Sequence, residues 1–147
     1  MPKIISINTS KKKGISKSPV EQGFFRKDLG LEGDAHAGPG ERQVSLLAME
    51  AINIFNQSLP TNTGKIKPGD FAENLTIEGM DFSTIKLGSQ IKIGDVLLEI
   101  SMLGKKCLRH CAIYKKLGSC IMPIQGVFAR VINGGRIKKG DGIQKEK

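Results

Sequence analysis

All three cysteines of the chain and one of its two histidines lie within GKKCLRHCAIYKKLGSC, residues 104–120. Zinc in structural sites is held by four such ligands in a tetrahedron, and three cysteines with one histidine form an established set. Cys107, His110, Cys111 and Cys120 are therefore a candidate zinc site. Three of these four crowd into five residues, whereas zinc ligands usually come as two close pairs, so the spacing matches no standard zinc finger.

Cys107 also has the surroundings of a reactive thiol. Lys105 and Arg109 lie two positions away on either side, with another lysine between Lys105 and the cysteine. Nearby cations lower the pKa of a thiol, and the thiolate is the form that attacks sulfur or binds a metal. Cys107 is therefore a candidate nucleophile or sulfur carrier. Cys111 and Cys120 have apolar neighbours, and we expect both to be small hydrophobic residues of the core.

The elements that must position this segment are mostly short strands. The chain contains 18 Gly, six Pro and few aromatic residues, a composition typical of many tight turns. Gly94 and Asp95 separate two apolar runs and predict a two-residue hairpin. Helical spacing of apolar residues predicts one helix over residues 48–57, and a second is expected over 108–117. Strands are expected at residues 3–10, 23–34, 71–77, 90–93, 96–103, 126–132 and 136–141. The predicted fold class is mostly β: a small β-barrel with one or two short helices.

Several positions carry more specific expectations. Residues 11–20 should form a loop, and the Asn133-Gly134-Gly135 turn should join two antiparallel strands. Glu73 and Asn74 interrupt an otherwise regular strand pattern, which indicates a bulge or a pair lining a pocket. Core positions are expected at Phe24, Phe25, Leu97, Ile100 and Val127.

Composition limits the class of protein. At 147 residues with 39% hydrophobic residues, we expect a single domain over residues 1–147. The net charge of +9 suits an anionic partner, but only residues 11–13 form a basic run and no aromatic residues interleave with it, which argues against nucleic-acid binding. No apolar run approaches the roughly 20 residues of a membrane span. The N-terminal sequence lacks the features of a signal peptide, and the three cysteines suit a reducing compartment, so we expect a cytoplasmic protein.

Five blocks, taken together and in order, resemble the MOSC domain, which is the C-terminal domain of molybdenum-cofactor sulfurases. They are GLEGDAHAG at 30–38, RQVSLL at 42–47, GDFAENLTIEG at 69–79, GKKC at 104–107 and GVFARVINGGRIKKGD at 126–141. The resemblance covers residues 30–141. It implies a β-barrel with short helices, in agreement with the pattern of elements.

The resemblance also implies a role around the molybdenum cofactor (molybdopterin): carrying sulfur toward the metal, or binding the cofactor, permanently or transiently. The cysteine typical of the family aligns with Cys107, where it would carry a persulfide or bind molybdenum as a thiolate. The pyridoxal-phosphate domain of full sulfurases has no counterpart here, so the implied partners are a cysteine desulfurase and a molybdoenzyme or cofactor-synthesis protein.

Eight further residues in or beside these blocks are candidates for binding the cofactor. Asp34 and His36 lie on a glycine-rich loop that could meet a ligand or simply form a local turn. Arg42 could hold a phosphate with paired hydrogen bonds or form a salt bridge at a strand end. Arg130 shares a predicted strand face with apolar residues, so it either lines a polar pocket or reaches solvent. The remaining candidates are Glu73, Asn74, Lys105 and Arg109.

Two other classes of function stay open at this point. One is a binding module without catalysis, in which the cysteine segment holds a structural zinc ion. The other is an oxidoreductase domain that keeps the molybdenum cofactor for the reduction of N-hydroxylated substrates. The chain shows no flavin or haem motif, so such a domain would depend on a partner protein for electrons.

Overall fold

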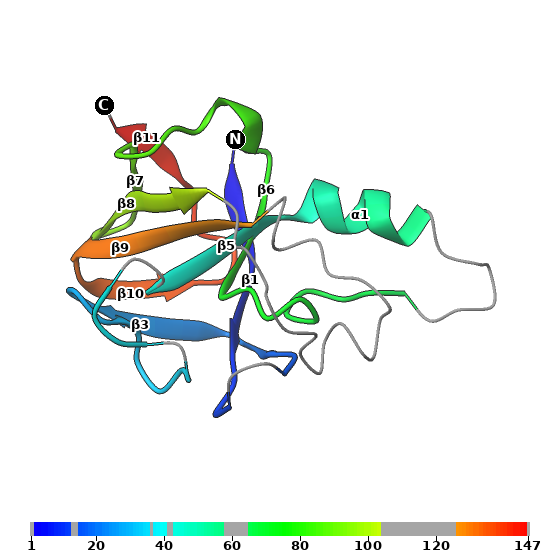
Figure 1. Ribbon diagram of the computed structural model, residues 1–147, viewed down its shortest axis with the longest axis horizontal. Helices are drawn as coiled ribbons and strands as arrows, with labels where there is room; N and C mark the ends of the chain where they lie inside the picture. Colours follow the sequence, from blue (N-terminus) through cyan, green and yellow to red (C-terminus); the bar gives the residue numbers. More distant parts are fainter. Residues whose placement is uncertain are drawn as a thin grey trace.

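The computed structural model describes residues 2–12, 15–35, 37–40, 43–57, 65–103 and 126–146. Within these ranges the chain is mostly β, with one α-helix and one short 3-10 helix (Figure 1). The elements in chain order are β1 (Lys3–Thr9), β2 (Ser18–Val20), β3 (Gln22–Arg26), β4 (Gly30–Leu31), β5 (Val44–Ala48), α1 (Met49–Gln57), β6 (Leu75–Glu78), η1 (Phe82–Thr84), β7 (Gln90–Ile93), β8 (Val96–Leu103), β9 (Val127–Asn133), β10 (Gly135–Lys138) and β11 (Gln144–Glu146).

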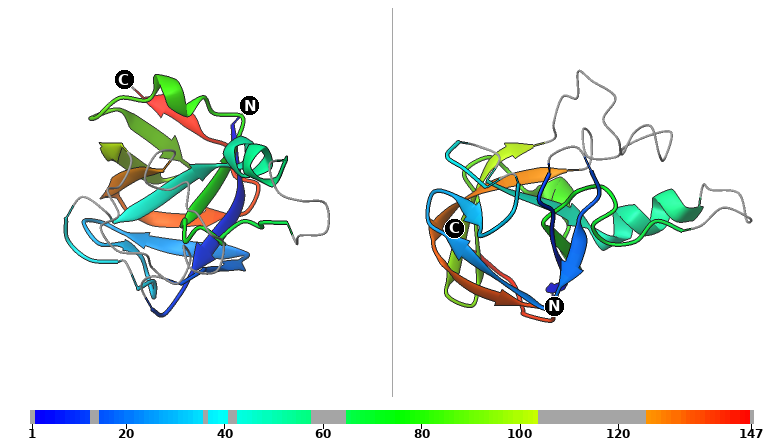
Figure 2. Two further views of the ribbon diagram at one scale, coloured as in Figure 1. Left: turned by 45° about the vertical axis from the view of Figure 1, so that its right-hand side comes forward. Right: turned by 90° about the horizontal axis from the view of Figure 1, so that it is seen from below.

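The strands form two sheets that curl around one core. Eight strands follow the order β11-β7-β8-β9-β5-β6-β1-β2, and three follow the order β10-β3-β4. Among the described strand pairs only β5 and β6 run parallel. Backbone bonds from Ile4 to Asp141 and from Gly140 to Ile4 join β1 to the turn after β10. The sheets therefore bend into the half-barrel visible in Figure 2, which confirms the predicted mostly β, barrel-like fold.

Apolar side chains collect on both faces of the larger sheet. The larger cluster fills the inside of the curl and includes Ile7, Leu46, Leu75 and Leu98. A smaller cluster lies on the opposite face and includes Leu47, Ile52 of α1, Phe71 and Phe128. Since strand residues alternate between faces, Leu46 and Leu47 can each serve a different cluster. The larger sheet is thus covered by apolar contacts on both sides where α1 packs.

Two local predictions are confirmed. Gly94 and Asp95 connect β7 to β8, and the register places Ile93 opposite Val96, as a two-residue hairpin requires. The predicted helix is α1, with Ile52 as its fully buried residue.

Other local predictions were wrong. The turn at Asn133-Gly134-Gly135 does not fold β10 back on β9: it passes the chain to the other sheet, where β10 pairs with β3. The segment 11–20, expected to be a loop, contributes Ser18–Val20 as β2. Phe24 is 44% exposed, because neighbouring strand residues face opposite sides and Phe25 takes the inner one.

The strand predicted over residues 71–77 begins only at Leu75. Ala72 has a positive φ of 66°, a left-handed conformation that interrupts extended backbone before the strand. Glu73 and Asn74 therefore belong to the loop before β6 rather than to a bulge within it.

One register row crosses the larger sheet. It runs from Leu103 to Val127, then to Leu46, Leu75 and Ile7. The two strands that flank residues 104–125 are thus paired with each other at Leu103 and Val127. No helix of the described residues has the length and apolarity to cross a bilayer.

Candidate functional site

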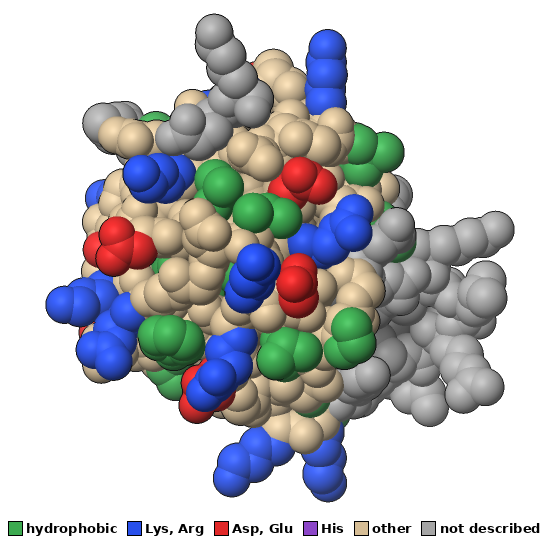
Figure 3. All heavy atoms as spheres, turned by 90° about the vertical axis from the view of Figure 1, so that its left-hand side faces the viewer, with side chains coloured by type: hydrophobic (Ala, Val, Ile, Leu, Met, Phe, Trp, Pro, Cys, Tyr) green, Lys and Arg blue, Asp and Glu red, His purple; other side chains and the backbone are tan. Residues whose placement is uncertain are grey.

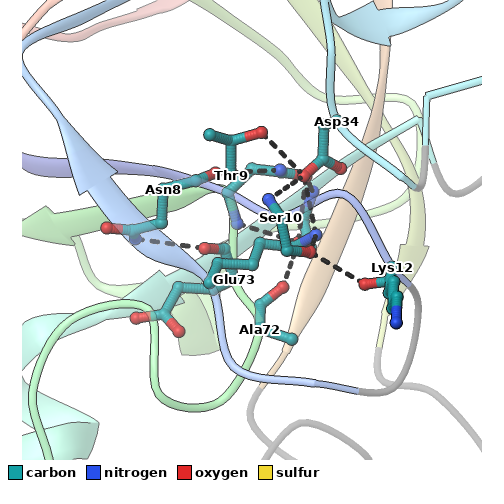
Figure 4. A network of polar contacts seen from close by, with 10 residues as sticks. Asn8, Thr9, Ser10, Lys12, Asp34, Ala72 and Glu73 are labelled. Atoms are coloured by element: carbon teal, nitrogen blue, oxygen red, sulfur yellow. Dashed lines mark hydrogen bonds and ion pairs between the residues drawn. The ribbon is translucent and has the colours of Figure 1, made fainter.

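Asp34 of the glycine-rich loop is joined to Lys17 by a buried ion pair. The Lys17 Nζ lies 2.7 Å from Asp34 Oδ1, and both side chains are completely buried. Asp34 Oδ1 also accepts hydrogen bonds from the Ser10 backbone N–H at 3.0 Å and the Thr9 hydroxyl at 3.2 Å. Figure 4 shows Thr9, Ser10 and Asp34 gathered at the end of β1. A buried lysine needs such a partner, since an isolated ammonium group is very costly to remove from water.

The surroundings of Asp34 keep its carboxylate charged. Burial by itself raises the pKa of Asp34, but the hydrogen bond and charge of Lys17, helped by hydrogen bonds from Ser10 and Asn74, outweigh it. The net result is a pKa below the ordinary value of 3.8. Asp34 is therefore the fixed anion that anchors this loop: its side-chain bonds reach across 17 and 24 residues of sequence, while its backbone forms turn bonds with Leu31 and Ala37.

Asn8 of β1 connects this end of the sheet to the loop before β6. Its Nδ2 donates to the backbone carbonyl of Glu73 and to the hydroxyl of Thr76, both at 3.1 Å. Its Oδ1 accepts from the Ser6 hydroxyl at 2.6 Å. Its backbone N–H donates to the carbonyl of Asn74 at 2.7 Å. Both Nδ2 hydrogens and the Oδ1 atom of Asn8 are hydrogen-bonded, so the amide holds the two segments in one relative position.

Glu73 is a buried carboxyl group with one oxygen that lacks a partner. Its Oε2 accepts from the Gly69 backbone N–H at 3.0 Å and from the Thr76 hydroxyl at 2.8 Å. Its Oε1 is buried and has no hydrogen-bond partner. Burial, with a smaller contribution from the charge of Asp70, raises the pKa of Glu73 to about 7. Glu73 thus binds its proton far more tightly than an exposed glutamate does.

Asn74 links β1, β5 and β6. Its Oδ1 accepts from the Ser45 backbone N–H at 3.0 Å, and its Nδ2 donates to the Asn8 carbonyl at 3.2 Å. Its own backbone N–H donates to the Ser45 hydroxyl at 3.0 Å. These bonds satisfy the backbone where parallel β5 and β6 begin to pair, a structural use that accounts for an asparagine at this point.

Arg130 lies on β9 and is only partly buried. The register places it opposite Glu99 of β8. Its Nε atom is buried and without a hydrogen-bond partner. Unsatisfied buried donors are rare in folded proteins, so an anion that binds beside β9 would meet a donor already free to hold it.

The other predicted site residues lie outside the described residues: His36, Arg42, Lys105, Cys107 and Arg109, together with His110, Cys111, Cys120 and the predicted helix at 108–117. Their roles, including the zinc site, stay predictions. Within the part of the chain that the structure describes, no group of three or more His, Cys, Asp or Glu could hold a metal ion.

Three members of the network, Asn8, Lys17 and Ser45, were not among the residues predicted from sequence. Lys17 stands in a polar, basic stretch where a lysine normally faces water. Asn8 stands near the end of a run of β-branched residues, where an asparagine is typical of a turn. A buried amide or ammonium becomes recognisable only when its partner, 17 to 66 residues away, is in place.

Comparison with known proteins identifies the family to which these residues belong. The family model for the MOSC domain matches residues 32–144. The chain belongs to the MOSC domain family. The matched part of the chain contains every predicted site residue, from Asp34 to Arg130.

Two curated relatives align with this MOSC chain. The uncharacterized protein YflK of Bacillus subtilis is 22% identical over 144 residues, covering 89% of this chain and 62% of YflK. YiiM of Escherichia coli is 26% identical over 113 residues, covering 73% of this chain and 50% of YiiM. The chain therefore spans only about half to three fifths of the length of these relatives.

Solved structures share the fold of this chain. YuaD of Bacillus subtilis superposes with a TM-score of 0.77 at 19% identity, covering 97% of this chain and 94% of YuaD. YiiM of Geobacillus stearothermophilus superposes with a TM-score of 0.75 at 20% identity, covering all of this chain and 76% of that protein. At these identities the similarity concerns the fold. Membership of the MOSC family relates the chain, in general terms, to the sulfur chemistry of the molybdenum cofactor.

Proposed function

We propose that this chain is a sulfur carrier or binding domain for the molybdenum cofactor, with Cys107 as the acting residue. The observation that carries the proposal is the MOSC match over residues 32–144, which includes Cys107 and its basic neighbours. Residues 104–125 contain five Lys or Arg and no Asp or Glu. Such a segment favours a thiolate over a thiol, and it attracts anions.

The paired strands on either side of residues 104–125 support this role. Leu103 and Val127, on either side of it, are paired across β8 and β9. Ser45 and Asn74, one position from the same register row, are fixed by mutual hydrogen bonds. A reactive segment attached to fixed strands loses less entropy when it meets a ligand than one attached to loose chain.

In the proposed carrier step, a partner cysteine desulfurase presents a persulfide. The Cys107 thiolate attacks the outer sulfur of that persulfide, and a new S–S bond forms at Cys107 while the donor S–S bond breaks. The donor cysteine leaves as a thiolate, so sulfur moves with no net oxidation or reduction. Lys105 and Arg109 would keep Cys107 ionised in this step. Pyridoxal phosphate would be needed only by the partner.

The residues present also fit the molybdenum cofactor. A thiolate at Cys107 is a soft ligand of the kind that binds such metals, and the unsatisfied Nε of Arg130 fits an anionic group. Arg42 would add a second guanidinium for the phosphate. The bound cofactor would supply a metal to which sulfur can be delivered. The buried Asp34, Glu73 and Asn74 would act on it by fixing the loops around it.

On this proposal the protein works in the cytoplasm, with a desulfurase as donor and a molybdoenzyme or cofactor-synthesis protein as acceptor. On the face shown in Figure 3, Lys and Arg side chains are interspersed with acidic and apolar ones. On this face (Figure 3) the basic side chains are interrupted by acidic and apolar ones and form no continuous track of the kind that nucleic acid requires.

The test is the mass of the purified protein before and after incubation with a cysteine desulfurase and cysteine. One added sulfur that survives denaturation, disappears with a reductant and maps to Cys107 is the expected result. Cys107→Ser should take up no sulfur, whereas Cys111→Ser should take it up normally and differ chiefly in stability. Equal uptake by the Cys107→Ser protein would refute the carrier role of Cys107.

The same masses distinguish the zinc alternative. A protein that stays unmodified and loses the mass of one zinc ion on denaturation holds a structural metal at the cysteine segment. Chelation should then lower its folding stability, because a structural metal contributes its binding energy to the folded state.

A further inference from the structure

The loop before β6 is held closed on the segment after β1 by a small set of contacts. The Lys17 N–H donates to the Gly69 carbonyl at 2.7 Å, and the Ser16 hydroxyl donates to the Asp70 carbonyl at 2.9 Å. Gly69 packs so tightly against the Lys17 carbonyl that a Cβ atom would overlap it. The Gly69 N–H is in turn bound by the Glu73 carboxyl. Gly69 is therefore held by two contacts: one from Glu73 in the same loop, and one from Lys17 in the segment after β1.

The state of the Glu73 carboxyl decides how stable this closure is. The Gly69 N–H and the Thr76 hydroxyl both bind Oε2, and the backbone N–H of Glu73 itself also favours the charged form, whereas the buried Oε1 has no hydrogen-bond partner. A neutral carboxyl group leaves at most one O–H without a partner there, which costs less than burying a charge. A charged one leaves half of its charge without a hydrogen bond in an interior that solvates it poorly.

We propose that the carboxyl group of Glu73 is a proton-operated latch: while protonated it holds loop 67–74 closed on the segment after β1, and its deprotonation opens that loop. The latch goes beyond the proposed sulfur chemistry and does not depend on it. Opening would let water reach Glu73 and would release the contacts of Gly69 and Asp70 with Lys17 and Ser16.

The charges around Glu73 favour this response. The Asp70 carboxylate, in the same loop, disfavours the charged form of Glu73 and so raises the Glu73 pKa. The facing groups on β1 and β6, Asn8 and Thr76, are neutral hydrogen-bonding side chains. The ammonium of Lys17 is bound to Asp34 and Ser10. Within the described residues, the hydrogen bonds to the Glu73 carboxyl oxygens come from Gly69 and Thr76, neither of which carries a charge.

The pH range follows from the pKa of Glu73 in the two states. In the closed loop the pKa is about 7, and in an open, hydrated loop it should return toward the model value of 4.5. The closed loop then binds more protons between these values, so closure weakens as the pH rises through this range and changes little above it. The opening constant should rise by roughly tenfold for each pH unit between about 5 and 7.

Amide hydrogen exchange tests the latch in the full-length protein. Protection factors, corrected for the intrinsic effect of pH on exchange, would be measured from pH 4.5 to 8.5 at Gly69 and Lys17. Amides of the β7–β8 hairpin serve as the internal reference. We expect protection at Gly69 and Lys17 to fall steeply up to about pH 7 and then level off. Protection at Gly69 and Lys17 as high as at the reference amides throughout this range would show that these amides exchange only when the whole protein unfolds, and would overturn the latch.

Two variants and one titration complete the test. Glu73→Gln keeps the shape and removes the titration, so its protection profile should be flat; a profile like that of the unsubstituted protein would overturn the proposal. Asp70→Asn removes the nearby negative charge and should move the fall to lower pH. If Glu73→Gln does not fold, NMR of the Glu73 carboxyl carbon in the unsubstituted protein decides the matter. A midpoint near neutrality supports the latch, and one near the ordinary value refutes it.

Discussion

Replacing Lys17 by Met removes the ammonium group but keeps a side chain of similar length. It leaves the Asp34 carboxylate, which is completely buried, without the cation 2.7 Å away. Removing one partner of a buried ion pair costs about 3–5 kcal/mol, because the remaining charge is neither paired nor hydrated. Typical folded proteins have only about 5–15 kcal/mol of stability, so the variant should be severely destabilised.

The assay is urea unfolding followed by far-UV circular dichroism, because the chain has no Trp and a single Tyr. The deficit of Lys17→Met should depend on pH. In the unsubstituted protein the pKa of Asp34 is below 3.8, so the stability it contributes is present above that value and is lost as the pH falls through the lower, folded pKa. Without Lys17, burial raises that pKa instead, and the penalty then grows as the pH rises. The difference between the proteins should therefore be largest near neutral pH.

A double variant isolates the charge. Lys17→Met with Asp34→Asn removes both charges while the Asn oxygen can still accept the Ser10 N–H, so it should regain a large part of the lost stability. A loss below about 1 kcal/mol in Lys17→Met would refute the reasoning, since that is the value of an exposed pair. A double variant less stable than Lys17→Met would show that packing rather than charge is responsible.

Three further outcomes are expected. Because the folded pKa of Glu73 is raised to about 7, global stability should fall by up to about 3 kcal/mol as the pH rises from 4.5 to 7, and urea midpoints of Glu73→Gln should lack this fall. Gly94→Ala, in an open turn with positive φ, should cost about 1–2 kcal/mol in urea unfolding, whereas Gly69→Ala should cost clearly more because its Cβ overlaps a backbone carbonyl. Ile52→Ala should cost about 2–4 kcal/mol in thermal or urea unfolding, while Ile54→Ala, at a side chain 67% exposed, should change little.

The parts of the fold that the sequence predicted correctly depend on near neighbours. The β7–β8 hairpin follows from two apolar runs and the two residues between them, and α1 follows from apolar spacing within one short segment. The predictions that were wrong concern features that depend on strands far apart in the sequence. The Asn-Gly turn after β9 has the composition of a hairpin, yet β10 finds its partner in β3, more than 100 residues earlier. Turn composition does not specify which strand lies beyond the turn.

The candidate site shows the same division. Its proposed reactive element, the cysteine segment, could be singled out because its cysteines, its histidine and its cations are close in sequence. The buried network could not, since Asn8 and Glu73 are 65 residues apart and Lys17 looks like any surface lysine. The sequence did indicate an irregularity at Glu73 and Asn74. It could not show that these two side chains face inward. Their direction depends on the positive φ of Ala72, and an alanine gives no indication in the sequence that it adopts this conformation.

The network also joins two motif blocks that are separate in sequence. GLEGDAHAG contributes Asp34, and GDFAENLTIEG contributes Gly69, Glu73 and Asn74. The two blocks meet at the end of β1, where Ser10 and Lys17 bind Asp34 while Lys17 also bonds to Gly69. A change in either block therefore disturbs the other through the same lysine.

Residues of these blocks can thus be important without touching a ligand. Asp34, Glu73 and Asn74 are buried and bonded to the protein itself, so substitutions there should lower folding stability and ligand binding together. Arg130 keeps a donor without a partner, so replacing it should weaken anion binding while stability changes less. Measuring both quantities for Asn74→Ala and Arg130→Met would separate the residues that build the site from those that meet its ligand. Equal effects on both quantities in Arg130→Met would place it among the residues that build the site.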